Sequence, residues 1–181
     1  WQSVLRSSWF VLVLIGTPVR AQSWTDIGNY SSLLRRAGTQ TLVAKDCPSG
    51  LLGAFMPDGM LAFVLNNLQD DPAQVWTVLA HESAHVMQHC QQGALLPDHQ
   101  IDNALAQIEK QSLSSFQELR LYHQSQRRDE IEARLVQDLP MAEVRELFRG
   151  FCGDRLRRHA SKSIPAVGLG EDEDAPITPI T

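Results

Sequence analysis

The stretch that decides the fold covers residues 72–93 and reads PAQVWTVLAHESAHVMQHCQQG. Asp70 and Asp71 precede it, so a capping carboxylate and then Pro72 stand where a helix N-terminus needs them. No further proline and no glycine follows until Gly93, and apolar side chains recur along the segment at helical spacing. The sequence therefore predicts one helix of about five or six turns.

Residues 81–85 of this helix read HESAH, the HExxH pattern. Two histidines four positions apart lie on one helix face, about 5 to 6 Å apart at Cβ, and can bind one zinc ion together. Glu82 follows the first histidine and is placed to take a proton from a water molecule at the metal. It is the only formal charge in residues 73–89, which favours a buried helix. We therefore predict His81 and His85 as zinc ligands and Glu82 as the general base.

The third ligand is expected from another part of the chain, because His89 lies about 12 Å from His81 along the helix axis. Residues 129–134 read DEIEAR. An HExxH helix with a downstream ExxA resembles the gluzincins, and more narrowly the CAAX-prenyl-protease-like peptidases. The resemblance implies that Glu130 is the third ligand and that Ala133 is the small residue that lets the two helices approach closely.

Arg134 departs from that family's pattern, which has an aspartate that orients a ligand histidine. Carboxylates commonly take this role, and Asp129 or Asp138 is the candidate here. Glu132 is the alternative third ligand. It points to roughly the opposite side of a helix from Glu130, so the two cannot both bind the ion.

The resemblance implies an α+β fold, a mostly helical zincin-like domain with a small antiparallel sheet or hairpin before the HExxH helix. It also implies a zinc-dependent peptidase acting on a peptide or protein substrate, in which Zn²⁺ is a Lewis acid and Glu82 passes the water proton to the leaving amine. Residues 60–67 are placed to be the edge strand that pairs with extended substrate. A further donor would stabilise the oxyanion, and the candidates are Tyr122, His123, Arg127 and His159.

The other segments predict short elements. Apolar spacing indicates a helix over Trp24–Arg36, and residues 41–44 favour a strand. The turn Pro57-Asp58-Gly59 separates two apolar runs, residues 51–56 and 60–65, which is typical of a hairpin. Later helices are predicted over residues 98–109, 114–125, 127–137 and 140–159.

Composition indicates one domain. The 181 residues are 43% hydrophobic and 20% charged, and no linker-like segment divides the middle of the chain. We place the zincin-like domain at residues 22–159 and expect residues 160–181 to form a disordered acidic tail. No basic stripe or nucleic-acid-binding motif occurs, so nucleic acid is not an expected partner.

The N-terminal segment has the features of a signal peptide. Arg6 precedes an apolar run over residues 9–15, and small residues lead to a cleavage position after Ala21. We expect residues 1–21 to be removed and the protein to be exported, to a periplasm or the extracellular space. The run is shorter than a membrane span needs, so a membrane anchor is the less favoured reading and no stable span is expected in the mature protein.

Three cysteines allow one disulfide in an oxidising compartment, with the pairing open among Cys47, Cys90 and Cys152. An upstream cysteine is also a zinc ligand in deformylases, but the other motifs of those enzymes do not occur in the sequence. The non-enzymatic alternative is a zinc-stabilised binding module, or a peptidase relative without turnover. The sequence leaves the cleavage specificity and the oligomeric state open.

Overall fold

The computed structural model describes residues 23–56, 58–64 and 66–162. The expected signal peptide lies outside these ranges, and so do residues 163–181 of the expected tail. The strands are β1 (Gln40–Ala44), β2 (Gly53–Phe55) and β3 (Met60–Val64). The α-helices are α1 (Trp24–Arg36), α2 (Pro72–Gln91), α3 (Ile101–Gln111), α4 (Leu113–Leu119), α5 (Gln124–Gln137), α6 (Met141–Phe151) and α7 (Gly153–Lys162), and a 3₁₀ turn at Asp98–Gln100 precedes α3. The predicted α+β class, mostly helical, is confirmed.

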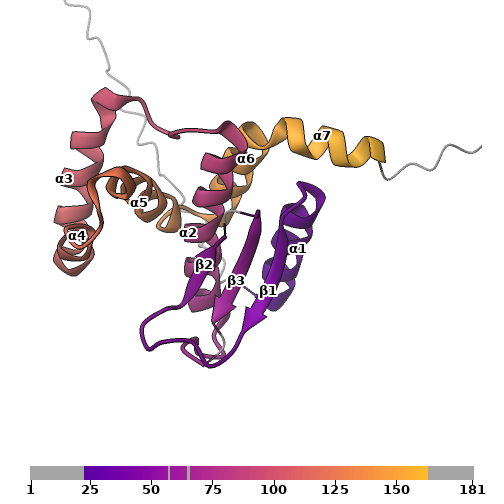
Figure 1. Ribbon diagram of the computed structural model, residues 1–181, viewed down its shortest axis with the longest axis horizontal. Helices are drawn as coiled ribbons and strands as arrows, with labels where there is room; N and C mark the ends of the chain where they lie inside the picture. Colours follow the sequence, from indigo (N-terminus) through magenta and orange to yellow (C-terminus); the bar gives the residue numbers. More distant parts are fainter. Residues whose placement is uncertain (1–22, 57, 65, 163–181) are drawn as a thin grey trace, which may run out of the picture.

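The sheet has the order β1-β3-β2 and is mixed (Figure 1). β2 pairs antiparallel with β3, as the hairpin predicts, but β1 pairs parallel with β3. The expectation of an antiparallel sheet is therefore wrong for one of its two pairings. The segment expected as the edge strand, residues 60–67, forms the central strand instead, because β3 carries the fully buried Leu61 and packs against the core. The edge strands are β1 and β2.

Helix α2 is central to the fold and contacts β2, α1, α5 and α6. Asp71 caps its N-terminus, accepting hydrogen bonds from the backbone N–H groups of Ala73 and Gln74. Beneath it, the ring of Tyr30 from α1 meets the rings of Trp76 and Phe148 edge-on, at 5.1 and 6.0 Å between centroids. The main core therefore joins α1, α2 and α6 around three aromatic side chains.

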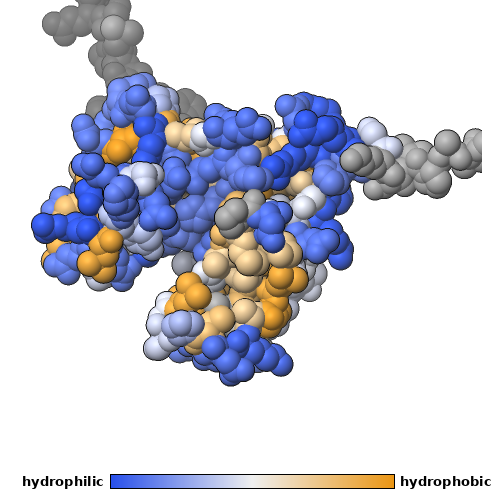
Figure 2. Space-filling model, viewed as in Figure 1, coloured by the Kyte–Doolittle hydropathy of each residue, from blue (hydrophilic) through white to orange (hydrophobic). Residues whose placement is uncertain are grey.

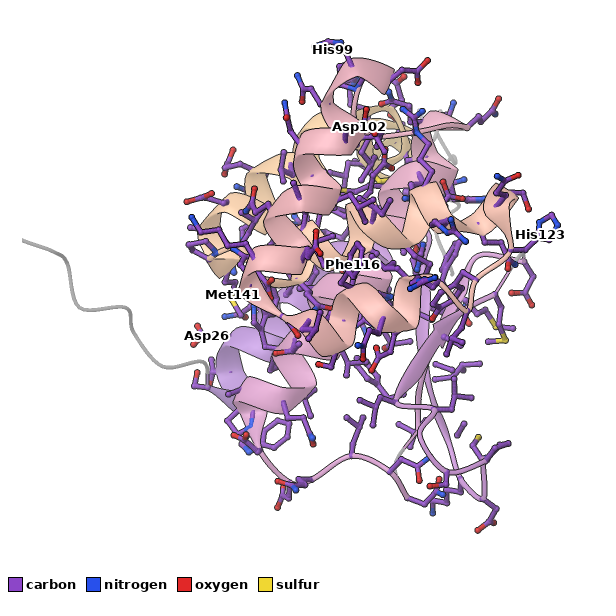
Figure 3. The ribbon with its side chains drawn as sticks, turned by 90° about the vertical axis from the view of Figure 1, so that its left-hand side faces the viewer. Asp26, His99, Asp102, Phe116, His123 and Met141 are labelled. Carbon is purple, nitrogen blue, oxygen red and sulfur yellow. A yellow bond between two sulfur atoms is a disulfide. The ribbon has the colours of Figure 1, made fainter. Side chains whose placement is uncertain are left out.

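Helices α3 and α4 pack on α5 through a second, smaller apolar cluster. The partly buried Phe116 of α4 packs against this cluster (Figure 3). Helix α4 ends at Leu119, earlier than predicted, and α5 begins at Gln124. The helix predicted over residues 140–159 is divided into α6 and α7 at Cys152. Figure 2 shows apolar residues gathered over the sheet, while most residues over the helices on the same face are polar.

One disulfide, Cys90–Cys152, joins the last turn of α2 to the junction of α6 and α7. Cys47 is free, which settles the pairing that the sequence left open. Residues 160–162, expected in the tail, belong to α7. Within the described ranges, every helix is too short or too polar to cross a membrane.

Candidate metal centre

Helices α2 and α5 bring His81, His85 and Glu130 together. His81 Nε2 lies 3.4 Å from Glu130 Oε2, and His85 Nε2 lies 3.5 Å from Glu130 Oε1. The candidate ligand atoms all lie within 4.8 Å of one another. Ala84 of α2 and Ala133 of α5 are fully buried in the core that these helices share, so small side chains occupy the region where the two helices pack.

The geometry of this group fits a zinc ion. Two atoms that each lie about 2.0 to 2.1 Å from a tetrahedral zinc are roughly 3.3 Å apart, close to the separations between Glu130 and the two histidines. Glu130 Oε2 is buried and has no hydrogen-bond partner among the described residues. Two imidazoles and one carboxylate are a donor set that zinc accepts in catalytic sites, where a fourth position stays open.

Electrostatics also favour a cation here. Burial alone would raise the pKa of Glu130, but the interactions with His81 and His85 outweigh it and lower that pKa to about 2. Burial opposes protonation of His85, yet Glu130 and Gln88 raise its pKa. Positive charge between these groups is therefore stabilised, and a metal ion can take the place of protons.

Glu132, the alternative third ligand, lies elsewhere. Its carboxylate is 1% exposed and accepts hydrogen bonds from the backbone N–H groups of Leu95 and Leu96, both at 2.9 Å. The structure therefore places Glu130 with the histidines and uses Glu132 to hold the chain that follows α2.

Two glutamines face the outer nitrogens of the histidines. Gln137 Oε1 lies 3.1 Å from His81 Nδ1, and Gln88 Oε1 lies 2.8 Å from His85 Nδ1. The expectation that Asp129 or Asp138 has this role is wrong for the described structure. The spacing alone could have indicated both amides, because Gln88 follows His85 by three residues and Gln137 follows Glu130 by seven, each on the same helix face.

Arg134 replaces the aspartate of the resembled family and forms an ion pair with Glu118 of α4 at 2.7 Å. It also lines a small cavity of about 230 Å³ with His81 and Glu82. Arg134 therefore leaves the orientation of the histidines to other groups and places a cation beside the candidate site.

Glu82 is 6% exposed and faces β2. Burial raises its pKa, while His81 and His85 act in the opposite direction and the backbone N–H of Phe55 donates a hydrogen bond to its carboxylate. Gly53 brings the strand close: a Cβ atom there would lie 3.3 Å from Glu82 Cγ and 2.6 Å from Val78 Cγ1. A buried carboxylate beside the two imidazoles of the candidate site, with its proton affinity raised, is suited to general-base work.

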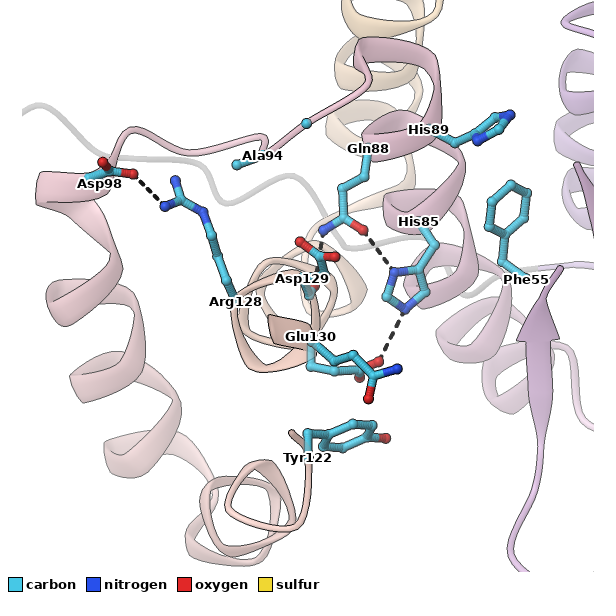
Figure 4. Close-up of a pocket in the computed structure, with 12 residues that line it drawn as sticks. Phe55, His85, Gln88, His89, Ala94, Asp98, Tyr122, Arg128, Asp129 and Glu130 are labelled. Atoms are coloured by element: carbon cyan, nitrogen blue, oxygen red, sulfur yellow. Dashed lines mark hydrogen bonds and ion pairs between the residues drawn. The ribbon is translucent and has the colours of Figure 1, made fainter. Parts of the chain in front are cut away.

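A second cavity, of about 650 Å³, includes Phe55, His85 and Glu130 among its lining residues (Figure 4), whereas His81 lines the smaller one. Tyr122, from the connection between α4 and α5, lines both cavities. Burial and the nearby Glu130 raise the pKa of Tyr122, which keeps its hydroxyl protonated as a donor. His89 lines the larger cavity and stacks edge-on against Phe55, outside the ligand group.

The other three oxyanion candidates do not line these cavities. His123 is exposed at the N-cap of α5 and projects outward (Figure 3). Arg127 is not among the residues that border either cavity. His159 lies on α7 beside Gly38 and lines a different pocket. Tyr122 is therefore the one of the four that the fold brings to the site.

Comparisons with known proteins give one family. Residues 68–153 match the model of a family described as "Domain of unknown function (DUF8637)". Neither the curated proteins nor the solved structures include a match to this chain. The matched segment holds α2 through α6 and so contains His81, Glu82, His85 and Glu130, while the sheet and α1 lie outside it.

Proposed function

We propose that this protein is a zinc-dependent peptidase of the gluzincin kind, with His81, His85 and Glu130 as the metal ligands. One observation carries the proposal: three ligand-type side chains from two helices converge within 4.8 Å, next to the buried carboxylate of Glu82 and between two cavities. A purely structural zinc site would normally have a fourth protein ligand and no such carboxylate beside it.

The residues divide the chemistry among them. When bound, zinc supplies a Lewis acid that polarises the scissile carbonyl and lowers the pKa of water. Glu82 takes the proton of the attacking water and returns it to the leaving amine, and its burial favours the proton-bearing form between these steps. Tyr122 donates a hydrogen bond to the oxyanion that develops on the substrate.

The free edge of β2 supports a peptide substrate. The N–H of Met56 donates to the carbonyl of Met60, so the backbone groups of the neighbouring Phe55 face away from β3. The groups of Gly53 share that outward edge, because residues two apart in a strand have the same orientation. The N–H of Phe55 already donates to Glu82, so the carbonyl of Phe55 and the backbone groups of Gly53 remain for an extended peptide. A peptide bound there by β-augmentation runs past Glu82 and between the two cavities.

The disulfide supports export. Cross-links of this kind persist in oxidising compartments, so Cys90–Cys152 agrees with a periplasmic or extracellular location.

The test combines metal analysis and proteolysis on the full chain. We expect about one zinc per chain by mass spectrometry and cleavage of a quenched-fluorescent peptide library. His81→Ala and Glu130→Gln should lose both, while Glu82→Gln should keep zinc and lose cleavage. Tyr122→Phe should lower kcat by roughly 100-fold with zinc retained. The matched control is Glu109→Gln, an exposed glutamate on α3.

Each outcome separates the alternatives. A wild-type protein without zinc, under conditions in which a control metallopeptidase loads, would overturn the metal site. Zinc that depends on His81 and Glu130 without any cleavage would support the binding module instead. Cleavage that survives Glu82→Gln would refute the assigned general base.

A further inference from the structure

Gln88 lies between a metal-ligand candidate and a buried carboxylate. Its Oε1 is 2.8 Å from His85 Nδ1, and its Nε2 donates to Glu132 Oε2 at 2.9 Å and to the backbone carbonyl of Asp129 at 3.0 Å. Figure 4 shows this amide between the ring of His85 and helix α5. The contacts form a continuous path from α5 to Nδ1 of His85, the ring nitrogen opposite the proposed ligand atom.

The orientation of the Gln88 amide follows from its neighbours. A backbone carbonyl can only accept a hydrogen bond, so the group that faces Asp129 must be the NH₂. Glu132 adds a second acceptor on the same side, since the N–H groups of Leu95 and Leu96 already direct donors at its two oxygens. The amide oxygen of Gln88 must then face His85.

The consequence reaches His85. An amide oxygen has no proton to donate, so His85 must carry its own proton on Nδ1. In a neutral imidazole this leaves the lone pair on Nε2, the atom that lies 3.5 Å from Glu130. We propose that Gln88, held by Glu132 and the Asp129 carbonyl, is a positioning residue that fixes His85 in the metal-binding tautomer. The inference rests on the proposed zinc site, since its role there is to orient a ligand.

The hydrogen bonds from His85 through Gln88 to Glu132 also connect His85 to the wall of the larger cavity. Leu95 and Leu96, which donate to Glu132, belong to the connection after α2, and neighbouring residues Gly93 and Ala94 line the larger cavity. One buried carboxylate therefore holds both this connection and the orientation of His85. Among the described residues no acceptor faces the amide NH₂ of Gln137, which contacts His81 through Oε1 alone, so the path is specific to His85.

Two measurements test the proposal. The first is the zinc dissociation constant of the full chain, by competition with a chelator. Loss of a residue that orients a ligand typically weakens metal binding by about 10- to 100-fold, and we expect this for Gln88→Met. Glu132→Gln should weaken binding in the same direction, because one backbone N–H then faces an amide donor. The control is Gln111→Met, an exposed glutamine at the end of α3, for which no change is expected.

The second measurement does not need zinc or activity. Long-range ¹H–¹⁵N spectra of metal-free protein report which nitrogen of a neutral histidine carries the proton. The Glu130→Gln background removes the carboxylate that would compete for a proton on Nε2. We expect His85 to be protonated on Nδ1 in this background and to become a mixture of tautomers when Gln88→Met is added.

These readouts distinguish the proposal from its foundation. A His85 that carries its proton on Nε2 while Gln88 is intact would overturn the positioning role, and so would a tautomer that Gln88→Met leaves unchanged. Failure of the wild type to bind zinc would overturn the proposed function. The tautomer measurement uses metal-free protein, so it would still show whether Gln88 orients His85. A loss of stability alone would not shift the tautomer, so a purely structural role for Gln88 would be detected.

Discussion

Gly53→Ala is the substitution that most directly tests how β2 is held against the site. A Cβ atom at position 53 would lie 2.6 Å from Val78 Cγ1, about 1 Å inside ordinary carbon–carbon contact. Val78 is buried and β-branched on a helix, so it has essentially one rotamer and cannot turn away. The carbonyl of Ala62 on β3, at 3.3 Å, limits movement within the sheet. The strand must therefore move off α2, at a cost of about 1 to 3 kcal/mol.

The assay has a stability arm and a functional arm. Urea unfolding with the disulfide intact should show the loss in free energy, and cleavage should fall because Phe55 moves with the strand and its N–H leaves Glu82. Zinc content should stay at the wild-type value, because the proposed ligands lie on α2 and α5. Gly28→Ala is the matched control: nothing lies within 4 Å of its Cβ, so this helical position should gain about 0.5 to 1 kcal/mol. A Gly53→Ala protein as stable as the wild type would refute the close-packing argument.

Two further predictions concern the metal-free protein and the disulfide. The pKa of Glu130 is about 2 in the folded protein and 4.5 for the free side chain. The ionised carboxylate should therefore add at most about 3 kcal/mol to the free energy of unfolding above pH 4.5, and this stabilisation should be lost as pH falls toward 2. The pKa of His85 is raised above 6.5 in the folded protein, so its protonation should increase the free energy of unfolding below pH 6.5. This stabilisation should be lost as pH rises through the pKa of His85 in the folded protein. Thermal unfolding of chelator-treated protein from pH 2 to 9 should show both slopes, and Glu130→Gln should flatten them; an unchanged profile would contradict the pairing. For the disulfide, replacing Cys90 and Cys152 together by alanine should cost about 2 to 4 kcal/mol in urea unfolding, since the bond spans 62 positions, whereas Cys47→Ser should cost nothing measurable. Equal stability of the double variant and the wild type would refute this estimate.

Local signals predicted the helices that carry the site well. Helix α1 has the predicted bounds, and α2 begins at Pro72 and ends at Gln91, two residues before the predicted end. Caps, proline and periodicity act within a few residues, so they can be read from the chain directly. The convergence of Glu130 with the histidines was expected from the resemblance to the gluzincins, and α2 and α5 pack against each other as that resemblance implies.

Features that depend on distant contacts were not predicted. Strand β3 lies between β1 and β2 and pairs parallel with β1, and no local sequence pattern specifies that order. The break at Cys152 lies where the chain is bonded to Cys90, although the helical pattern continues through it. Gln88 and Gln137 share a helix face with the site residues, but an uncharged amide resembles any other polar helix residue, whereas a carboxylate is the usual partner of a ligand histidine.

The disulfide makes a covalent ring of the chain between Cys90 and Cys152, and Glu130 belongs to that ring. His81 and His85 stand on the stem that leads into it, the nearer one five residues before the closure. Any local opening of α3 and α4 would leave Glu130 tethered near His81 and His85 at a high effective concentration. The proposed donor set would then reassemble by an intramolecular search over a short distance, so the proposed zinc site should tolerate local motion in the helices around it.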